Sequence, residues 1–265
     1  MSVLFEMLSY PFMVRALLAG TMLALCSALL GVSLVLKRYS MIGDGLSHVG
    51  FGALAIASAL NLAPLTVAIP ILVVAAIILL YMSDKGKVHG DAAIAMFSTG
   101  ALATGVMVIS LSSGMNADVY NYLFGSILSM SQSDVYLSLG ISIVVLILYI
   151  VFYNRIFAIT FDEDFALATG TNTKLYNILI AGLTALIIVL GMRMMGSLLI
   201  TSLIVFPALS SMQLCKDFKT VIISSAIISV ICLWCGMIIS YLYATPTGAS
   251  IVICNMIVFF IYYLL

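Results

Sequence analysis

Residues 220–265 contain no charged side chain, and this is the longest of several such runs in the chain. About 20 apolar residues suffice for a helix to cross the hydrocarbon core of a bilayer. Because water does not reach the backbone there, a crossing segment has to satisfy its own hydrogen bonds, as a helix does. The sequence therefore predicts an all-α, polytopic membrane protein.

The composition agrees with this prediction and excludes several other classes of protein. The chain is 64% hydrophobic and only 8% charged, with a mean hydropathy of +1.29, whereas a soluble domain has about 25% charged residues. Ten basic and ten acidic side chains balance, so no basic surface for nucleic acid is expected. The five cysteines are scattered, mostly in apolar runs, and we predict no disulfide. Glu6 and the lack of an early basic segment argue against a cleaved signal peptide.

Charge-free runs and turn residues predict about nine transmembrane helices, within a range of eight to ten, in a single permease domain over residues 1–265. Helix-breaking residues at 61–64 and 245–248 divide two long apolar runs. The expected spans are 12–36, 46–62, 65–82, 92–112, 135–153, 175–190, 195–214, 220–242 and 246–264.

The positions of the basic residues predict the orientation. Most lie in alternate loops, which the positive-inside rule assigns to the cytoplasm, so the N-terminus is expected outside and the C-terminus inside. Arg15 and Arg193 lie near outer ends, from where long side chains can reach the interface. Residues 119–133 are uncharged but too short to cross, and we expect a short helix there that covers an opening on the outer side.

Asp44 and His48 are the two residues that most strongly suggest a function. On a helix, a separation of four residues places both on one face, about 6 Å apart along the axis, and a carboxylate with an imidazole suits zinc, manganese or ferrous iron. Two ligands do not complete a shell, but a second copy of the chain about a twofold axis would supply two more. The alternative is that Asp44 caps the second span and His48 bonds a neighbouring helix. The cost of ionisable groups within a span favours a functional role.

A second group of residues lies in the largest cytoplasmic loop. Asp162 is suited to cap a short helix, Glu163 and Asp164 complement the positive end of its dipole, and Gly170 can adopt a left-handed stop. A helix this short needs a docking surface, either lipid headgroups or a cytoplasmic partner protein. The alternative is a plain surface helix. The apolar side chains expected to be exposed for docking are Phe161 and Phe165.

At these residues the chain resembles the membrane permeases of bacterial ATP-binding-cassette importers for zinc, manganese and iron. Residues 36–48 are similar to the family's segment between its first two spans, residues 162–170 to its cytoplasmic coupling helix, and residues 196–208 to its late span from glycine to proline–alanine. The chain departs from the family pattern at Gly45, and at Gly50 with Phe51, where relatives often carry alanine and a leucine–proline pair.

The resemblance implies a permease subunit in the bacterial inner membrane, paired with a second copy of itself and surrounded by lipid. Its partners would be cytoplasmic ATPase subunits and an extracytoplasmic metal-binding protein. Asp44 and His48 match the positions that contact the transported ion, and no permanently bound cofactor is expected. The residues expected to contact the ATPase are Asp162, Glu163, Asp164, Phe165, Ala166 and Gly170. Since the chain has no phosphate-binding Gly-Lys-Ser/Thr loop, ATP is expected on the partner, and the chain itself is not expected to be an enzyme.

Two other functions compete with this hypothesis. In a proton-coupled secondary transporter, Asp44 and His48 would relay protons instead of binding a metal. The segment Gly45-Leu46-Ser47-His48 could also suggest an intramembrane serine protease, although the sequence gives no sign of an oxyanion site.

Overall fold

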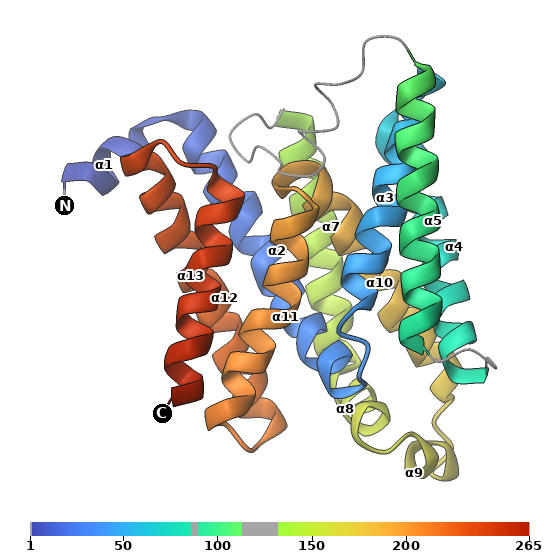
Figure 1. The fold of residues 1–265 in the computed structure, drawn as a ribbon. Coiled ribbons are helices and arrows are strands. Elements are labelled where there is room, and N and C mark those ends of the chain that lie inside the picture. The colour runs from blue at the N-terminus through green and yellow to red at the C-terminus, as the bar shows by residue number, and fades with distance from the viewer. Residues whose placement is uncertain (1, 86–89, 113–131, 265) are drawn as a thin grey trace.

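The structure is a computed structural model that describes residues 2–85, 90–112 and 132–264. The residues described form helices joined by short turns, without a strand (Figure 1). The helices are α1 (Ser2–Ser9), α2 (Pro11–Leu36), α3 (Ile42–Ala59), α4 (Pro64–Lys85), α5 (Gly90–Leu111), α7 (Gln132–Val151), α8 (Tyr153–Phe161), α9 (Glu163–Ala168), α10 (Thr173–Met195), α11 (Ser197–Leu214), α12 (Phe218–Tyr243) and α13 (Thr247–Leu264).

Eight of the helices described are long and apolar enough to cross a membrane, which confirms the predicted all-α, polytopic architecture. They are α2, α4, α5, α7, α10, α11, α12 and α13. The ninth expected span is α3, which is less apolar because it contains Asp44, His48 and several glycines. It is nevertheless largely buried, and packs against α4, α5, α10 and α11.

The predicted hairpin turns lie where the helix-breaking residues indicated. After α3, Asn61 has a φ of 52° and the Leu62 amide donates to the Ala57 carbonyl over 2.9 Å, the Schellman arrangement that ends many helices. Pro64 is the first residue of α4, a position where the missing amide proton of proline removes no hydrogen bond of the helix. Ala244, with a φ of 50°, ends α12 in the same left-handed conformation.

Several helix limits differ from those predicted. The helix α3 begins at Ile42 instead of residue 46, and α10 continues past residue 190 to Met195. Arg193 can lie within α10 because its guanidinium pairs with the Asp134 carboxylate of α7 at 2.9 Å. The short helices α1 and α8 were not predicted. A short outer helix was expected at residues 119–133. Residues 119–131 lie outside the part of the chain described, and residues 132 and 133 are the first two residues of α7.

A single residue joins α10 to α11. Gly196 is both the C-cap of α10 and the N-cap of α11, with φ 87° and ψ 158°. Only glycine adopts this conformation readily. The connection therefore turns the chain back on itself within one residue.

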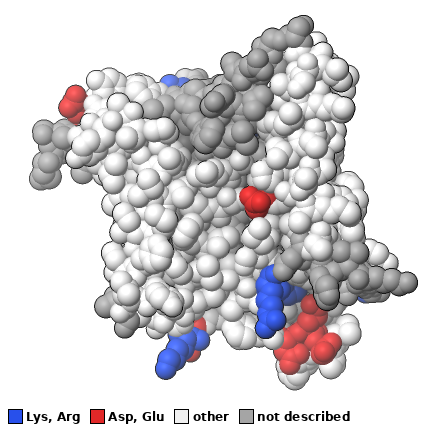
Figure 2. All heavy atoms as spheres, in the orientation of Figure 1, with Lys and Arg blue, Asp and Glu red and all other residues white. Residues whose placement is uncertain are grey.

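The charged side chains gather mainly at one end of the bundle, below an almost uncharged middle (Figure 2). This basic end consists of the α2–α3 turn, α8, α9 with the start of α10, and the α11–α12 turn, and the C-terminus lies near it in Figure 1. Its basic side chains are Lys37, Arg38, Arg155, Lys174, Lys216 and Lys219. Around the middle, apolar side chains of α5, α7 and α13 are exposed, as expected where lipid is the solvent.

Candidate functional site

The first turns of α3 bring Asp44 and His48 together as the sequence predicted. The carboxylate oxygen Oδ2 of Asp44 lies 3.7 Å from Nε2 of His48, with the two side chains 47% and 22% exposed, respectively. Because α3 starts at Ile42, its N-cap is Met41. The alternative that Asp44 caps this span is therefore wrong. Its carboxylate instead lies within the first turn, where the helix dipole favours a negative charge.

The glycines on either side of Asp44 show which way its side chain faces. A Cβ atom on Gly43 would contact Ile204 and Thr201 of α11, and one on Gly45 would lie 2.6 Å from Cγ2 of Ile94 on α5. Asp44 therefore lies at the opening between α11 and α5. The resemblance segments 36–48 and 196–208 thus meet at the site.

The donor atoms suit a cation held by few ligands. Nδ1 of His48 is buried without a hydrogen-bond partner in the structure described, so it makes no bond to a neighbouring helix. Two ligands on one zinc-like ion lie about 3.0–3.4 Å apart, from bond lengths near 2.1 Å. The observed 3.7 Å exceeds this by a few tenths of an ångström, which a small side-chain rotation would close. Within the described ranges no group of three or more His, Cys, Asp or Glu side chains could hold a metal.

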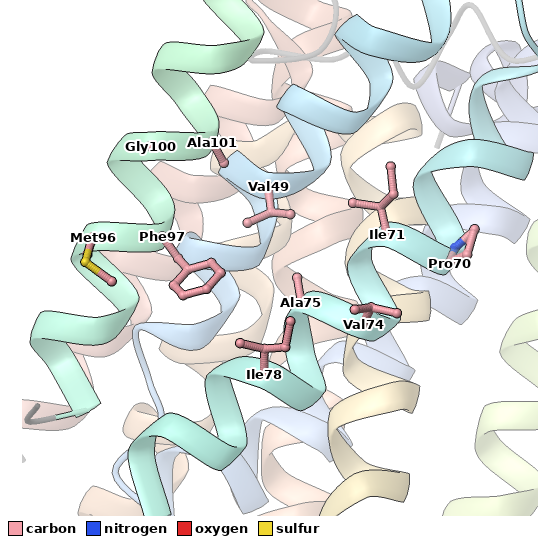
Figure 3. Close-up of a pocket in the computed structure, with 10 residues that line it drawn as sticks. All are labelled: Val49, Pro70, Ile71, Val74, Ala75, Ile78, Met96, Phe97, Gly100 and Ala101. Carbon is pink, nitrogen blue, oxygen red and sulfur yellow. The ribbon is translucent and has the colours of Figure 1, made fainter. Parts of the chain in front are cut away.

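A second hollow of the surface lacks the chemistry for a cation. It is a groove of about 680 Å³ between α4 and α5, and its lining side chains are carbon apart from one methionine sulfur and the ring nitrogen of a proline (Figure 3). These residues are Val49, Pro70, Ile71, Val74, Ala75, Ile78, Met96, Phe97, Gly100 and Ala101. The groove offers no carboxylate or imidazole, whereas Asp44 and His48 carry both of these donor groups.

The helix α9 has the local structure that its sequence predicted. The Asp162 side chain caps it by accepting a hydrogen bond of 2.8 Å from the Phe165 amide. At the other end Gly170 has a φ of 83°, and the Thr171 amide donates to the Ala166 carbonyl over 2.9 Å. This again is the Schellman ending. The helix projects from the basic end of the bundle (Figure 1).

The outer surface of α9 combines acidic and apolar side chains. Phe165 is 64% and Leu167 60% exposed, whereas Ala166 is buried against the rest of the chain. Asp164 is exposed as well. Beside the helix lies a groove of about 660 Å³, whose walls include Tyr81 from α4. Large exposed apolar side chains outside the membrane span indicate an interaction surface.

Sequence reasoning missed the residues that anchor α9 to the bundle. The Lys37 ammonium lies 3.2 Å from Oε2 of Glu163 and also donates to the side-chain carbonyl of Asn177. Asn177 in turn donates to Oε1 of Glu163 over 2.8 Å. The prediction gave Glu163 a role toward the helix dipole and, from the family resemblance, a contact with the ATPase, but no contact with the bundle. No local pattern could pair it with residues 126 and 14 positions away.

The five cysteines are all unpaired, which confirms the prediction that none forms a disulfide. Cys232 is buried within α12, and Cys235 is exposed on the same helix. The spacing typical of a redox pair therefore occurs here inside an apolar span.

Taken together, the apolar helices and their charged end define a multi-pass, α-helical membrane protein. The model of the ABC 3 transport family matches residues 9–265, and the chain belongs to this family of ABC-transporter permeases. This membership agrees with the resemblance at residues 36–48, 162–170 and 196–208.

Individual relatives share the full length of the chain. The chain is 30% identical to the high-affinity zinc uptake system membrane protein ZnuB of Haemophilus influenzae, over 94% of this chain and 96% of that protein. It is 28% identical to the manganese transport system membrane protein MntC of Halalkalibacterium halodurans, over 94% and 85%. Among solved structures, PsaBC from Streptococcus pneumoniae, in complex with Fab, has a TM-score of 0.88 at 26% identity, and the match covers 99% of this chain and 94% of that one.

Proposed function

We propose that the chain is the membrane-spanning permease of an ABC importer that carries a divalent metal ion into the cytoplasm. The ion would be zinc, manganese or iron, since a carboxylate and an imidazole bind all three and similar proteins are named for zinc and for manganese transport. Family membership favours this function over a proton-coupled secondary transporter.

The observation that carries the proposal is the pairing of Asp44 with His48 on the open side of α3. Ionisable side chains within a membrane bundle are costly and mark the paths of ions. Here the Asp44 side chain faces the opening between α5 and α11, and Nε2 of His48 lies 3.7 Å from its carboxylate. A cation passing this opening would bind between these two atoms.

A second copy of the chain would complete the pathway. Two copies about a twofold axis would place two Asp44–His48 pairs around one ion path. Such a site has few ligands in each subunit and releases its ion readily, as transport requires. A closed four-ligand shell of the structural zinc kind would trap the ion.

The remaining partners follow from the two ends of the bundle. The basic end would face the cytoplasm of a bacterial cell, because basic side chains near short loops are retained there, and the N-terminus would lie outside the inner membrane. The exposed Phe165 and Leu167 on α9 would dock on an ATPase subunit, which supplies the ATP chemistry. An extracytoplasmic metal-binding protein would deliver the ion at the opposite end.

The proposed mechanism is alternating access. ATP binding would draw the two ATPase subunits together, and α9 would transmit this movement to the spans that surround α3. The Asp44–His48 pair would then face one side of the membrane and afterwards the other. The conformational change, and not the site itself, would use the energy of ATP.

The experiment that tests the proposal measures uptake of zinc and manganese into liposomes that contain the complete complex. We expect Asp44→Asn and His48→Gln each to reduce uptake about tenfold or more, in the range that loss of metal-site groups commonly causes. Both substitutions keep the size of the side chain and remove a metal ligand.

Ser47→Ala is the matched control, because its hydroxyl only bonds the Asp44 carbonyl of its own helix, over 2.8 Å. This variant should keep its uptake. Undiminished uptake in both ligand variants would refute the assigned role of Asp44 and His48. Uptake that continues without ATP but follows a proton gradient would refute the ABC mechanism.

A further inference from the structure

Three side chains from three separate helical segments form a closed set of contacts at the basic end. Lys37 is the C-cap of α2, Glu163 is the first residue of α9, and Asn177 lies on α10. Each contacts the other two: the ammonium of Lys37 reaches both oxygen-bearing partners, and the Asn177 amide reaches the Glu163 carboxylate. We call these three residues the basic-end triad.

Two of the three side chains in the triad are buried, whereas the Glu163 side chain is 43% exposed. The Lys37 side chain is only 10% exposed, and Asn177 is 5% exposed. Removing one partner from a buried charge leaves that charge uncompensated, which is far more unfavourable than breaking a surface ion pair. When α9 moves, the favourable response is therefore for Lys37 to move with Glu163.

Lys37 begins the turn between α2 and α3, and two hydrogen bonds hold this turn to the end of α2. The Arg38 amide donates to the Val35 carbonyl and the Tyr39 amide to the Leu34 carbonyl, over 3.0 and 2.8 Å. These are the two hydrogen bonds of a Schellman motif. Arg38 itself is in the left-handed region with a φ of 62°, which an arginine adopts only where the surroundings hold it.

The turn leads directly into the helix that carries the candidate metal ligands. The Ile42 amide donates to the Tyr39 carbonyl over 3.0 Å, so α3 starts at the end of the turn. Ile42 and Leu46 of α3 enclose one small space together with Lys37 and Asn177. These two side chains lie on the face of α3 opposite Asp44, since positions two residues apart on a helix point in different directions.

We infer that the basic-end triad transmits movement of α9 to the first turn of α3 and so sets the position of Asp44. Lys37 is thus a positioning residue, which acts on the ion path without contacting the ion. The inference rests on the import function proposed above. It adds that the route from the ATPase to the ion passes through the α2–α3 turn, because α9 contacts that turn through a buried charge.

The test compares metal uptake with ATP hydrolysis in liposomes that contain the complete complex. Lys37→Met keeps the unbranched apolar stem but removes the ammonium. We expect the number of ions carried per ATP hydrolysed to fall roughly tenfold, within the range of typical couplings between sites, while the variant still assembles with the ATPase. Lys37→Arg retains a cation that can reach both partners and should keep most of the ratio.

Arg155→Met is the matched control. The Arg155 guanidinium also holds the segment after α9, by a hydrogen bond of 2.8 Å to the Thr171 hydroxyl, but among the residues described it has no hydrogen bond or ion pair with the triad. The Arg155→Met variant should carry as many ions per ATP hydrolysed as the wild type. A wild-type ratio in Lys37→Met, an equal fall of uptake and hydrolysis, or the same uncoupling in Arg155→Met would each overturn the inference.

A second measurement does not depend on transport. Hydrogen–deuterium exchange of residues 42–48 is compared with and without ATP in the complex, for the wild type, Lys37→Met and Glu163→Gln. We expect ATP to change exchange in the wild type and to have little effect in the two variants. An equal ATP effect in all three would overturn the inference, whereas a wild-type complex that carries no metal would refute the proposed function instead.

Discussion

At the scale of single residues, the chain uses its few charged side chains in two different ways. Asp44 is half exposed beside His48, so its carboxylate is available to a cation. Lys37 is mostly buried and already has two partners, so its ammonium holds protein segments together. Exposure and existing contacts, more than residue type, separate the two roles.

The cap of α9 gives a prediction at this scale. Asp162→Ala removes the acceptor of the Phe165 amide and should destabilise the helix by about 1 kcal/mol. Hydrogen–deuterium exchange of residues 165–168 should therefore accelerate about fivefold, which corresponds to that free energy. Asp162→Asn, an equally good cap, should leave the exchange rate near that of the wild type. Equal rates in both variants would show that the cap does not stabilise α9.

The role of a residue could be predicted from the sequence where that role depends only on residues nearby in the chain. The cap at Asp162 and the left-handed stop at Gly170 depend only on nearby positions. The contact of Lys37 with Asn177, 140 positions away, depends on how α2 and α10 pack. No sequence periodicity indicates that packing.

At the scale of helices, close approach of backbones organises the bundle. Gly31 of α2 lies against the backbone of Ile204 on α11, so that an added Cβ would overlap the carbonyl oxygen. Small residues at helix interfaces allow such approach in membranes, where the hydrophobic effect does not drive helices together. The same helix α11 lies against Gly43, next to Asp44, through Ile204 and Thr201.

Gly31→Ala should therefore separate α2 from α11. A backbone oxygen cannot rotate out of the way as a side chain can, so we expect a loss of about 3 kcal/mol, at the upper end of typical overpacking effects. Thermal unfolding in detergent measures this change. Gly182→Ala on α10 is the control, because nothing lies within 4 Å of an added Cβ there. A Gly31→Ala variant as stable as this control would contradict the packing argument.

The helices themselves were predictable because each crossing needs a long apolar run, and the turns because Asn61, Pro64 and Thr245–Gly248 interrupt such runs. The C-terminal end of α10 could not be predicted from the sequence. Arg193 indicated an end near residue 190, but its pairing with Asp134 depends on a distant helix. The short helices α1 and α8 do not span the membrane and have no comparable signal.

At the scale of the whole molecule, we propose that the site is one half of an arrangement formed by two copies of the chain. The open side of α3 leaves the Asp44 side chain 47% exposed. In a membrane, a carboxylate facing lipid is strongly disfavoured. A second copy of the chain on this face would shield it.

Cross-linking tests this pairing directly. In a chain whose five native cysteines are replaced by alanine, Asp44→Cys should yield a covalent dimer with a short thiol-reactive cross-linker. Ile147→Cys on α7 is the control. Its side chain is 54% exposed, but α7 packs against α2, α8 and α10, away from the opening. Equal cross-linking at both positions, or none at Asp44→Cys, would contradict the twofold arrangement.

The single glycine between α10 and α11 limits how the ion path can open. With only Gly196 as a linker, the two helices have no slack at that end and cannot slide independently along their axes. The lower part of α10 carries Asn177, and α11 flanks Asp44. A tilt about this shared pivot is the motion left to them, so the path should widen at the end away from Gly196 and stay narrow beside it.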